Sequence, residues 1–421
     1  MAKNQIISVL YKDTEIGKIG YDADQRKSFF QYQPDFLNSN QYKKLFPYII
    51  RRTSNVQVFS EFEGDTFRGL PPMIADSLPD VFGNLIFKQW LEFTHKEAVN
   101  ITPLEQLTYV GKRGMGALEF VPSKSFTSTT QINIDEITEV VKKVLDVKSS
   151  IQEKGLSDLA LRNIFKIGTS AGGARPKILI SEHKESGAII AGDLESTNQY
   201  NHYLIKLAID EGQGYSKEKV EFVYYQLATS IGIEMMPSKL IDDKHFATLR
   251  FDRQNGQKQH ILTASGMAGW DFRKPENSNY DNLFKLSIGL KVPHKDIQQL
   301  FKRMVFNLVL ANIDDHLKNF SFIYDHQKDK WNLAPAYDLT YPLDALMNYI
   351  KVSRAMAING KRTDINKQDL LEIAERYSIK NAKGIINEVI KATEDFKALC
   401  EIQNLPEKVI QKIYTEFNLL T

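Results

Sequence analysis

The chain has 421 residues, of which 42% are hydrophobic and 25% are charged. This length and composition exclude a short peptide scaffold, a disordered chain and a coiled coil, and predict two or three domains of about 100 to 200 residues each. The 54 lysines and arginines nearly balance the 52 acids, so the net charge of +2 gives the whole chain no positive excess that would indicate nucleic-acid binding.

Cysteine content and hydropathy predict where the protein works. The single cysteine, Cys400, cannot form a disulfide within the chain, and no CxxC or HExxH spacing indicates a zinc site. No run approaches the roughly 18 apolar residues of a membrane span, and the amino terminus turns polar too early for a signal peptide. We therefore expect a protein of the reducing cytoplasm that has no contact with membranes.

The first third of the chain begins with strand-like alternation. Apolar residues at 6–10 and 16–21 flank the polar stretch 12–15, which predicts a β-hairpin. Apolar residues recur at helical spacing across 77–93, which predicts an amphipathic helix. The Ser- and Thr-rich stretch 122–134 is typical of a loop or linker.

A mixed region and then a helical region follow. Short β-prone runs lie at 177–181, 188–191, 202–207 and 246–250. Ser216 is placed to cap a helix that ends at Gly232. Apolar stripes at helical spacing then occur at 297–309, 370–377, 385–400 and 407–417. These patterns predict an α+β chain whose carboxy-terminal lobe is helical.

The sequence NIDDHLKN, directly after the predicted helix at 297–309, carries the most informative spacing. In kinases an Asp that accepts the substrate hydroxyl proton precedes a magnesium-binding Asn by five residues, as Asp314 precedes Asn319 here. Asp338, in the sequence AYDLT, is placed like the metal-binding Asp of kinases. The adjacent Asp315 leaves open which acid is the base, and acid-rich turns also cap helices or meet water.

Three further features precede this loop. The sequence GTSAGGARPK at 168–177 can bring backbone amides and two cations to phosphate oxygens, although a flexible hairpin turn would have the same composition. Lys206 lies in an apolar run and Glu221 on the following predicted helix, in the order of the kinase lysine and glutamate. Alternatively, Lys206 is an edge-strand lysine whose ammonium group is solvated, and Glu221 lies on a solvated face of its helix. The order of all these features along the chain is that of a kinase.

These motifs resemble the HipA family, the kinase toxins of bacterial type II toxin-antitoxin systems. The similar segments are Gly69-Leu70, SLPD at 77–80, YVG at 109–111, GAL at 116–118, SAGGARPK at 170–177, RFDR at 250–253, DDHLKN at 314–319 and AYDLT at 336–340. The resemblance implies an α+β, two-lobed protein-kinase-like fold. Its expected domains are a HipA-like amino-terminal domain at 1–121, a mixed kinase N-lobe at 122–255 and a helical C-lobe at 256–421.

The resemblance also implies site residues. Asp314 would accept the proton, and Asn319 and Asp338 would bind Mg²⁺. The implied ATP site comprises Gly172, Gly173, Ala174, Arg175, Pro176, Lys177, Lys206, Leu249, Arg250, Phe251, His316, Leu317, Lys318, Asn319, Tyr337 and Asp338. Ser170, with Thr169 as the neighbouring alternative, matches the serine at which family members autophosphorylate, where added negative charge would expel the loop and switch the kinase off.

The function that the resemblance implies is an ATP- and magnesium-dependent serine/threonine protein kinase. It would act as a toxin, phosphorylate a translation component such as an aminoacyl-tRNA synthetase, and inactivate itself at Ser170. The implied partner is a HipB-like helix-turn-helix antitoxin, through which DNA would be contacted indirectly. The alternatives are a small-molecule kinase of the aminoglycoside or choline type and a catalytically silent corepressor module.

Overall fold

The computed structural model describes residues 5–79, 82–88, 101–124, 133–145, 175–192, 197–209, 214–342 and 353–420. The chain divides into two compact units. The first comprises Met1–Ile209 and Ala247–Ile261, and the second comprises Asp210–Phe246 and Leu262–Thr421.

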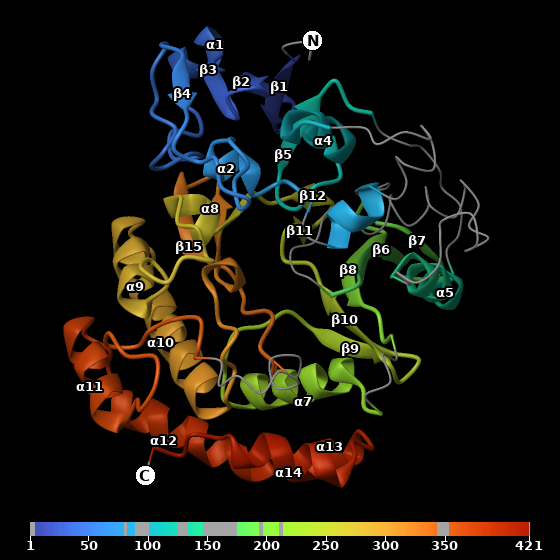
Figure 1. The fold of residues 1–421 in the computed structure, drawn as a ribbon, viewed down its shortest axis with the longest axis vertical. Helices are drawn as coiled ribbons and strands as arrows, with labels where there is room; N and C mark the ends of the chain where they lie inside the picture. The colour runs from blue at the N-terminus through green and yellow to red at the C-terminus, as the bar shows by residue number, and fades with distance from the viewer. Residues whose placement is uncertain are drawn as a thin grey trace. The chain divides into compact units, whose positions relative to one another are not determined.

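The first unit begins with a five-stranded antiparallel sheet in the order β4-β3-β2-β1-β5 (Figure 1). Its strands are β1 (Gln5–Tyr11), β2 (Thr14–Asp22), β3 (Lys27–Tyr32), β4 (Gln57–Phe59) and β5 (Leu118–Val121). The predicted hairpin is confirmed, since β1 pairs with β2 and only Lys12 and Asp13 lie between them. Both turn residues have positive φ, as a two-residue hairpin turn of type I′ requires.

Short helices accompany this sheet. They are α1 (Pro34–Asn38), α2 (Pro72–Ala75), a helical stretch at 82–88 and α4 (Pro103–Val110). The helix predicted at 77–93 is confirmed for residues 82–88. Residues 77–79 are not helical, and the rest of the predicted range lies outside the described residues. In the predicted loop at 122–134, residues 122–124 have no helix or strand, 125–132 lie outside the described residues, and Ile134 begins α5 (Ile134–Leu145).

Four adjacent strands in the order β7-β6-β8-β10 follow, and all of them belong to the first unit except the first two residues of β10. They are β7 (Ile189–Ala191), β6 (Lys177–His183), β8 (Tyr200–Lys206) and β10 (His245–Leu249). The four predicted strands are therefore confirmed, with their ends shifted by one or two residues. A small hairpin of β11 (Arg253–Gln254) and β12 (Gln257–Lys258) follows.

The second unit is mainly helical and includes a three-stranded sheet in the order β13-β14-β15. Its elements are α7 (Lys217–Ser230), β9 (Ser238–Ile241), β13 (Ile261–Thr263), α8 (Ala264–Ala268), α9 (Tyr280–Gly289), α10 (His294–Val309), β14 (Ser321–Asp325), β15 (Lys330–Leu333), α11 (Lys367–Arg376), α12 (Ala382–Ala392), α13 (Phe396–Ile402) and α14 (Glu407–Thr415). Ser216 caps α7 as predicted, because its Oγ accepts a hydrogen bond from the backbone N–H of Lys219.

One predicted helix is interrupted and another is confirmed. The stripe at 385–400 is divided into α12 and α13 by a 3₁₀ turn at Thr393–Asp395, where the Thr393 hydroxyl donates to the carbonyl of Ile390. The stripe at 297–309 is confirmed as α10, a buried helix in which Leu300 and Phe301 are fully buried. The loop that leaves α10 therefore starts from the core of the second unit. No helix in the described ranges combines the length and apolarity that crossing a bilayer requires.

Candidate active site

The loop after α10 carries the Asp and Asn of the predicted catalytic spacing. Asp314 is exposed, whereas Asn319 ends a short 3₁₀ helix, Leu317–Asn319. The Nδ2 of Asn319 donates a hydrogen bond to the backbone carbonyl of Asp314 at 2.8 Å. This bond closes the loop on itself and uses the amide nitrogen, so the amide oxygen is the atom that remains to bind a cation.

The neighbouring acid, Asp315, has the opposite environment. Its side chain is fully buried and is paired with the guanidinium of Arg354 at 2.5 Å. The hydroxyl of Tyr280 donates to Oδ2 at 2.6 Å, and the backbone N–H of Met356 donates to Oδ1 at 3.2 Å. Asp315 is thus a structural acid in the core, and Asp314 is the accessible one of the two acids.

The ionisation of the groups around Asp315 follows from this burial. Burial raises the pKa of Tyr280 well above its usual value, and the charge of Asp315 raises it further. Burial lowers the pKa of Arg354, but the charge of Asp315, the influence of Tyr280 and the hydrogen bonds to both residues together leave this pKa above its usual value. Tyr280 is therefore a neutral hydrogen-bond donor, and Arg354 is a fixed cation beneath the loop.

A chain of buried amides extends from this ion pair. The Nδ2 of Asn307, on α10, donates to the Tyr280 hydroxyl at 3.0 Å, and the Nδ2 of Asn312 donates to the Oδ1 of Asn307 at 2.9 Å. Asn312 also approaches the backbone carbonyl of Asp338 at 3.4 Å. Tyr280, Asn307 and Arg354 were not predicted from the sequence. The signal that could have found Asn307 is a lone amide in the apolar stripe of α10.

The AYDLT segment is held beside the same loop. The hydroxyl of Tyr337 donates to the carbonyl of Lys318 at 2.7 Å and lies 2.5 Å from the hydroxyl of Ser321. Asp338 has a φ of 53°, in the left-handed region that Asp tolerates better than most residues. The contacts of Tyr337 with Lys318 and of Asn312 with the Asp338 backbone place the AYDLT and DDHLKN segments side by side within the second unit. The metal-binding roles of Asn319 and Asp338 stay predictions.

The remaining residues of the DDHLKN sequence have different environments. Leu317 is fully buried and is part of the core. The ring of His316 lies 4.9 Å from that of Phe272, and its Nδ1 is buried without a hydrogen-bond partner in the described part of the chain. The ammonium of Lys318 lies 5.3 Å from the Phe272 ring centroid. Phe272 was not predicted from the sequence.

In the first unit, two lysines share one face of a sheet. Lys177 on β6 lies directly opposite Lys206 on β8, and both are buried. Residues directly opposite each other in an antiparallel pair have Cβ atoms about 5 Å apart on the same face. The alternative of a solvated edge-strand lysine is wrong for Lys206, because β8 lies between β6 and β10 and the residue is only 6% exposed.

Other predicted residues are placed as follows. Arg175 is half-buried, and its Nη1 has no hydrogen-bond partner in the described ranges; Pro176 accepts a backbone hydrogen bond from Leu207. Glu221, on α7 in the second unit, is 2% exposed, so a solvated helix face is wrong for it. Its pairing with Lys206 stays a prediction. Five loop residues lie outside the described residues: Thr169, Ser170, Gly172, Gly173 and Ala174.

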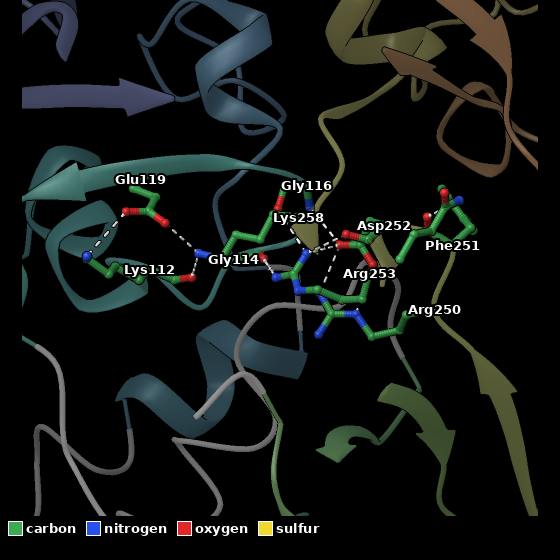
Figure 2. A network of polar contacts seen from close by, with 10 residues as sticks. Lys112, Gly114, Gly116, Glu119, Arg250, Phe251, Asp252, Arg253 and Lys258 are labelled. Carbon is green, nitrogen blue, oxygen red and sulfur yellow. Dashed lines mark hydrogen bonds and ion pairs between the residues drawn. The ribbon is translucent and has the colours of Figure 1, made fainter. Parts of the chain in front are cut away.

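Leu249, Arg250 and Phe251 form the segment that the HipA resemblance implies as a hinge against the adenine of ATP, and they belong to the first unit. The backbone N–H of Arg250 donates to the carbonyl of His202 on β8, and Leu249 and Phe251 flank it at low to intermediate exposure. The Arg250 side chain does not extend to solvent, because its guanidinium forms a buried ion pair with Asp252 at 2.8 Å (Figure 2). Any adenine contact of Arg250 would therefore come from its backbone.

The donor atoms fit magnesium rather than zinc. Among the described residues, no group of three or more His, Cys, Asp or Glu side chains could hold a metal ion by itself. Asn319 and Asp338 offer an amide oxygen and a carboxylate, which are the hard oxygen ligands that magnesium accepts together with phosphate oxygens and water. These donor atoms are therefore compatible with a magnesium ion that is also bound by nucleotide phosphates.

Comparison with known proteins identifies two domains. Residues 7–121 match the HipA N-terminal domain, and residues 169–396, more than half of the chain, match the HipA-like C-terminal domain. The chain is 25% identical over 259 residues to Y4dM of Sinorhizobium fredii, a candidate kinase, and 24% identical over 242 residues to the serine/threonine-protein kinase toxin HipA of Shewanella oneidensis.

These matches are partial in length. They cover 56% and 51% of this chain, and the chain spans 61% and 51% of the two relatives. A solved chain of the Shewanella oneidensis complex of HipA, HipB and operator DNA is similar over 98% of this chain and 96% of its own length, with a TM-score of 0.64 and 19% identity. The two domain matches and this likeness of fold show that the protein belongs to the HipA family and has the α+β, HipA-like kinase fold.

Proposed function

We propose that the protein is an ATP- and magnesium-dependent serine/threonine protein kinase. The observation that carries the proposal is the contrast between two adjacent acids: Asp314 is exposed in the loop that Asn319 closes, while Asp315 is buried in an ion pair. A phosphoryl-transfer site needs one accessible carboxylate near oxygen ligands for the metal, and the exposed Asp314 close to Asn319 supports such a site. Membership of the HipA family supports the same conclusion.

In the proposed reaction, Asp314 accepts the proton of the substrate hydroxyl and orients its oxygen towards the γ-phosphate. Asn319 and Asp338 bind magnesium, which when present offsets negative charge on the phosphates. Lys206, supported by Lys177 on the same face, binds phosphate oxygens. No side chain of the protein takes up the phosphoryl group in transfer to a substrate, so the chain acts by positioning and electrostatics.

The nucleotide site of this proposal is made of the residues that the sequence motifs supply. They are Gly172, Gly173, Ala174, Arg175, Pro176, Lys177, Lys206, Leu249, Arg250, Phe251, His316, Leu317, Lys318, Asn319, Tyr337 and Asp338. Glu221 is the proposed ion-pair partner of Lys206. The division of the chain into domains at 1–121, 122–255 and 256–421 is part of the same proposal.

We further propose that this kinase is the toxin of a type II toxin-antitoxin module. The relative named as a kinase toxin, and the similar chain from a complex with HipB and operator DNA, support this role. The partner would be a HipB-like helix-turn-helix protein that links the kinase to DNA, and the substrate would be a translation component such as an aminoacyl-tRNA synthetase. Ser170, or the adjacent Thr169, would be the site of inactivating autophosphorylation.

Intact mass measurement after incubation with ATP and magnesium tests the proposal. Wild type should gain about 80 Da per phosphate, mapped by fragmentation to Ser170 or Thr169, and Asp314→Ala should gain none. Asp243→Ala is the matched control, because Asp243 is a 72% exposed acid of the same unit that lies outside the loop. It should gain the same mass as wild type.

The same proteins should then be offered candidate protein substrates. Phosphorylation by Asp314→Ala at the wild-type rate would refute Asp314 as the base. If wild type binds ATP but modifies neither itself nor any protein, the protein-kinase proposal is wrong, and phosphorylation of an aminoglycoside or choline would then identify a small-molecule kinase. Growth arrest on expression that Asp314→Ala relieves would support the toxin role.

A further inference from the structure

A buried carboxylate lies at the carboxy-terminal side of the predicted hinge. Asp252 has no exposed surface, and its carboxylate accepts hydrogen bonds from Arg250, Arg253 and the backbone of Gly116 (Figure 2). Arg250 donates through Nε to Oδ1 at 2.9 Å and through Nη2 to Oδ2 at 2.8 Å, which is a two-pronged ion pair. Oδ2 also accepts from Nη1 of Arg253 at 2.9 Å and from the backbone N–H of Gly116 at 2.8 Å.

Arg253 extends the same network into the amino-terminal sheet region. Its Nη2 donates to the carbonyl of Gly114 at 2.8 Å and its Nη1 to the carbonyl of Gly116 at 3.0 Å. Both glycines lie in the loop between α4 and β5. Gly116 has a φ of 76°, and a Cβ there would lie 3.3 Å from the backbone nitrogen of Ile261. The loop is therefore held by backbone groups in a conformation that glycine permits.

The hinge backbone is fixed from both of its ends. On one side the N–H of Arg250 donates to the carbonyl of His202 on β8, the strand that carries Lys206. On the other side, Asp252 binds the side chain of Arg250 and the backbone of the α4–β5 loop, which lies 136 residues earlier in the chain. A buried ion with several charge-assisted hydrogen bonds allows few arrangements, so the intervening backbone has little freedom.

We propose that Asp252 and Arg253 are positioning residues through which the amino-terminal sheet region sets the affinity for ATP. They hold the backbone of Leu249–Phe251 in the conformation that receives the adenine. This inference rests on the proposed kinase function and on the hinge as its adenine site. Neither residue takes part in proton transfer, so their loss weakens ATP binding and leaves turnover of bound ATP nearly unchanged.

Two variants of the full-length protein test the inference. Asp252→Asn keeps the size of the side chain but removes its charge and one acceptor. Arg253→Lys keeps the charge but replaces the fork that reaches two carbonyls by a single ammonium. Each should raise KM and Kd for ATP by at least about tenfold and change kcat by less than about threefold.

The control is Lys258→Gln. Lys258, on β12, pairs through its side chain with Glu119 of β5 at 2.7 Å, while its backbone lies opposite that of Arg253 in the β11–β12 hairpin (Figure 2). The substitution thus removes a side-chain link to β5 and leaves the Asp252 and Arg253 side chains in place. The KM and Kd of the Lys258→Gln variant for ATP should equal those of the wild type. Thermal unfolding identifies folded variants, and all kinetics are measured well below their midpoints. If Asp252→Asn does not fold, Arg253→Lys decides the question.

The outcomes separate the two proposals. If the wild type binds ATP and the folded variants bind it as tightly as Lys258→Gln does, the positioning role is wrong and the proposed function stands. A fall in kcat with unchanged KM also overturns the positioning role. If wild type does not bind ATP with magnesium, the proposed function fails and the inference fails with it.

Discussion

Replacing Asp315 by asparagine should destabilise the second unit, whereas replacing its neighbour Asp314 by alanine should not. The Asp315 carboxylate is fully buried against Arg354, which is itself 4% exposed. Removing one partner of a buried pair leaves an uncompensated charge and costs about 3–5 kcal/mol. For a unit of this size, each kcal/mol of lost stability lowers the midpoint of thermal unfolding by roughly 2–4 °C, so this midpoint should fall by about 6–20 °C. Asp314 is exposed, so its replacement leaves no buried charge without a partner.

Calorimetry of the three proteins, followed by phosphoryl-transfer assays well below each midpoint, distinguishes the two roles. Asp314→Ala should keep the wild-type midpoint and lose transfer. Asp315→Asn should lose stability yet keep far more activity per folded molecule. A double variant, Asp315→Leu with Arg354→Met, should be less destabilised than either single variant, because no charge is then left buried alone. If Asp315→Asn unfolds at the wild-type midpoint, the buried pair does not stabilise the loop as we reason.

Three further predictions concern stability. Burial lowers the pKa of His260 to about 3 in the folded protein. In the unfolded chain this histidine binds a proton below its usual pKa of about 6.5, so the unfolded state is favoured as the pH falls from there towards 3. The free energy of unfolding should therefore decrease over this range by up to about 1.4 kcal/mol per pH unit. Urea titrations across this range should show the decrease, and His260→Phe should reduce it; equal slopes would contradict the assignment. Asn366 caps α11 by accepting hydrogen bonds from the N–H groups of Gln368 and Asp369. In denaturant unfolding, Asn366→Ala should therefore lower the free energy of unfolding by about 1 kcal/mol, and Asn366→Ser should lower it much less. Equal losses in the two variants would argue against capping. Trp331 is 1% exposed, and its ring lies 5.2 Å from that of Tyr324. Trp331→Ala should therefore lower the free energy of unfolding by about 3–5 kcal/mol. A similar loss for Trp331→Phe would rule out cavity formation as the cause.

Local features of the fold followed from the sequence because their partners are close along the chain. The hairpin of β1 and β2 depends on alternation and a two-residue turn, and the cap at Ser216 binds an N–H three residues ahead. The division of the stripe at 385–400 was missed, because its apolar spacing continues across the turn at Thr393. Periodicity reports which face is buried, whereas it does not report a break in the backbone between two helices on the same face.

The sequence alone determined the order of the kinase-like motifs and the Asp314 to Asn319 spacing, because both can be read along the linear chain without knowledge of its folding. Only the tertiary structure decided which of two adjacent acids is accessible. Asp315 is buried by Tyr280 and Arg354, which lie 35 and 39 residues away in opposite directions, and Asp252 by a loop 136 residues earlier. A loop has no periodicity from which burial can be predicted, so the environment of a loop carboxylate depends on contacts between segments that only folding brings together.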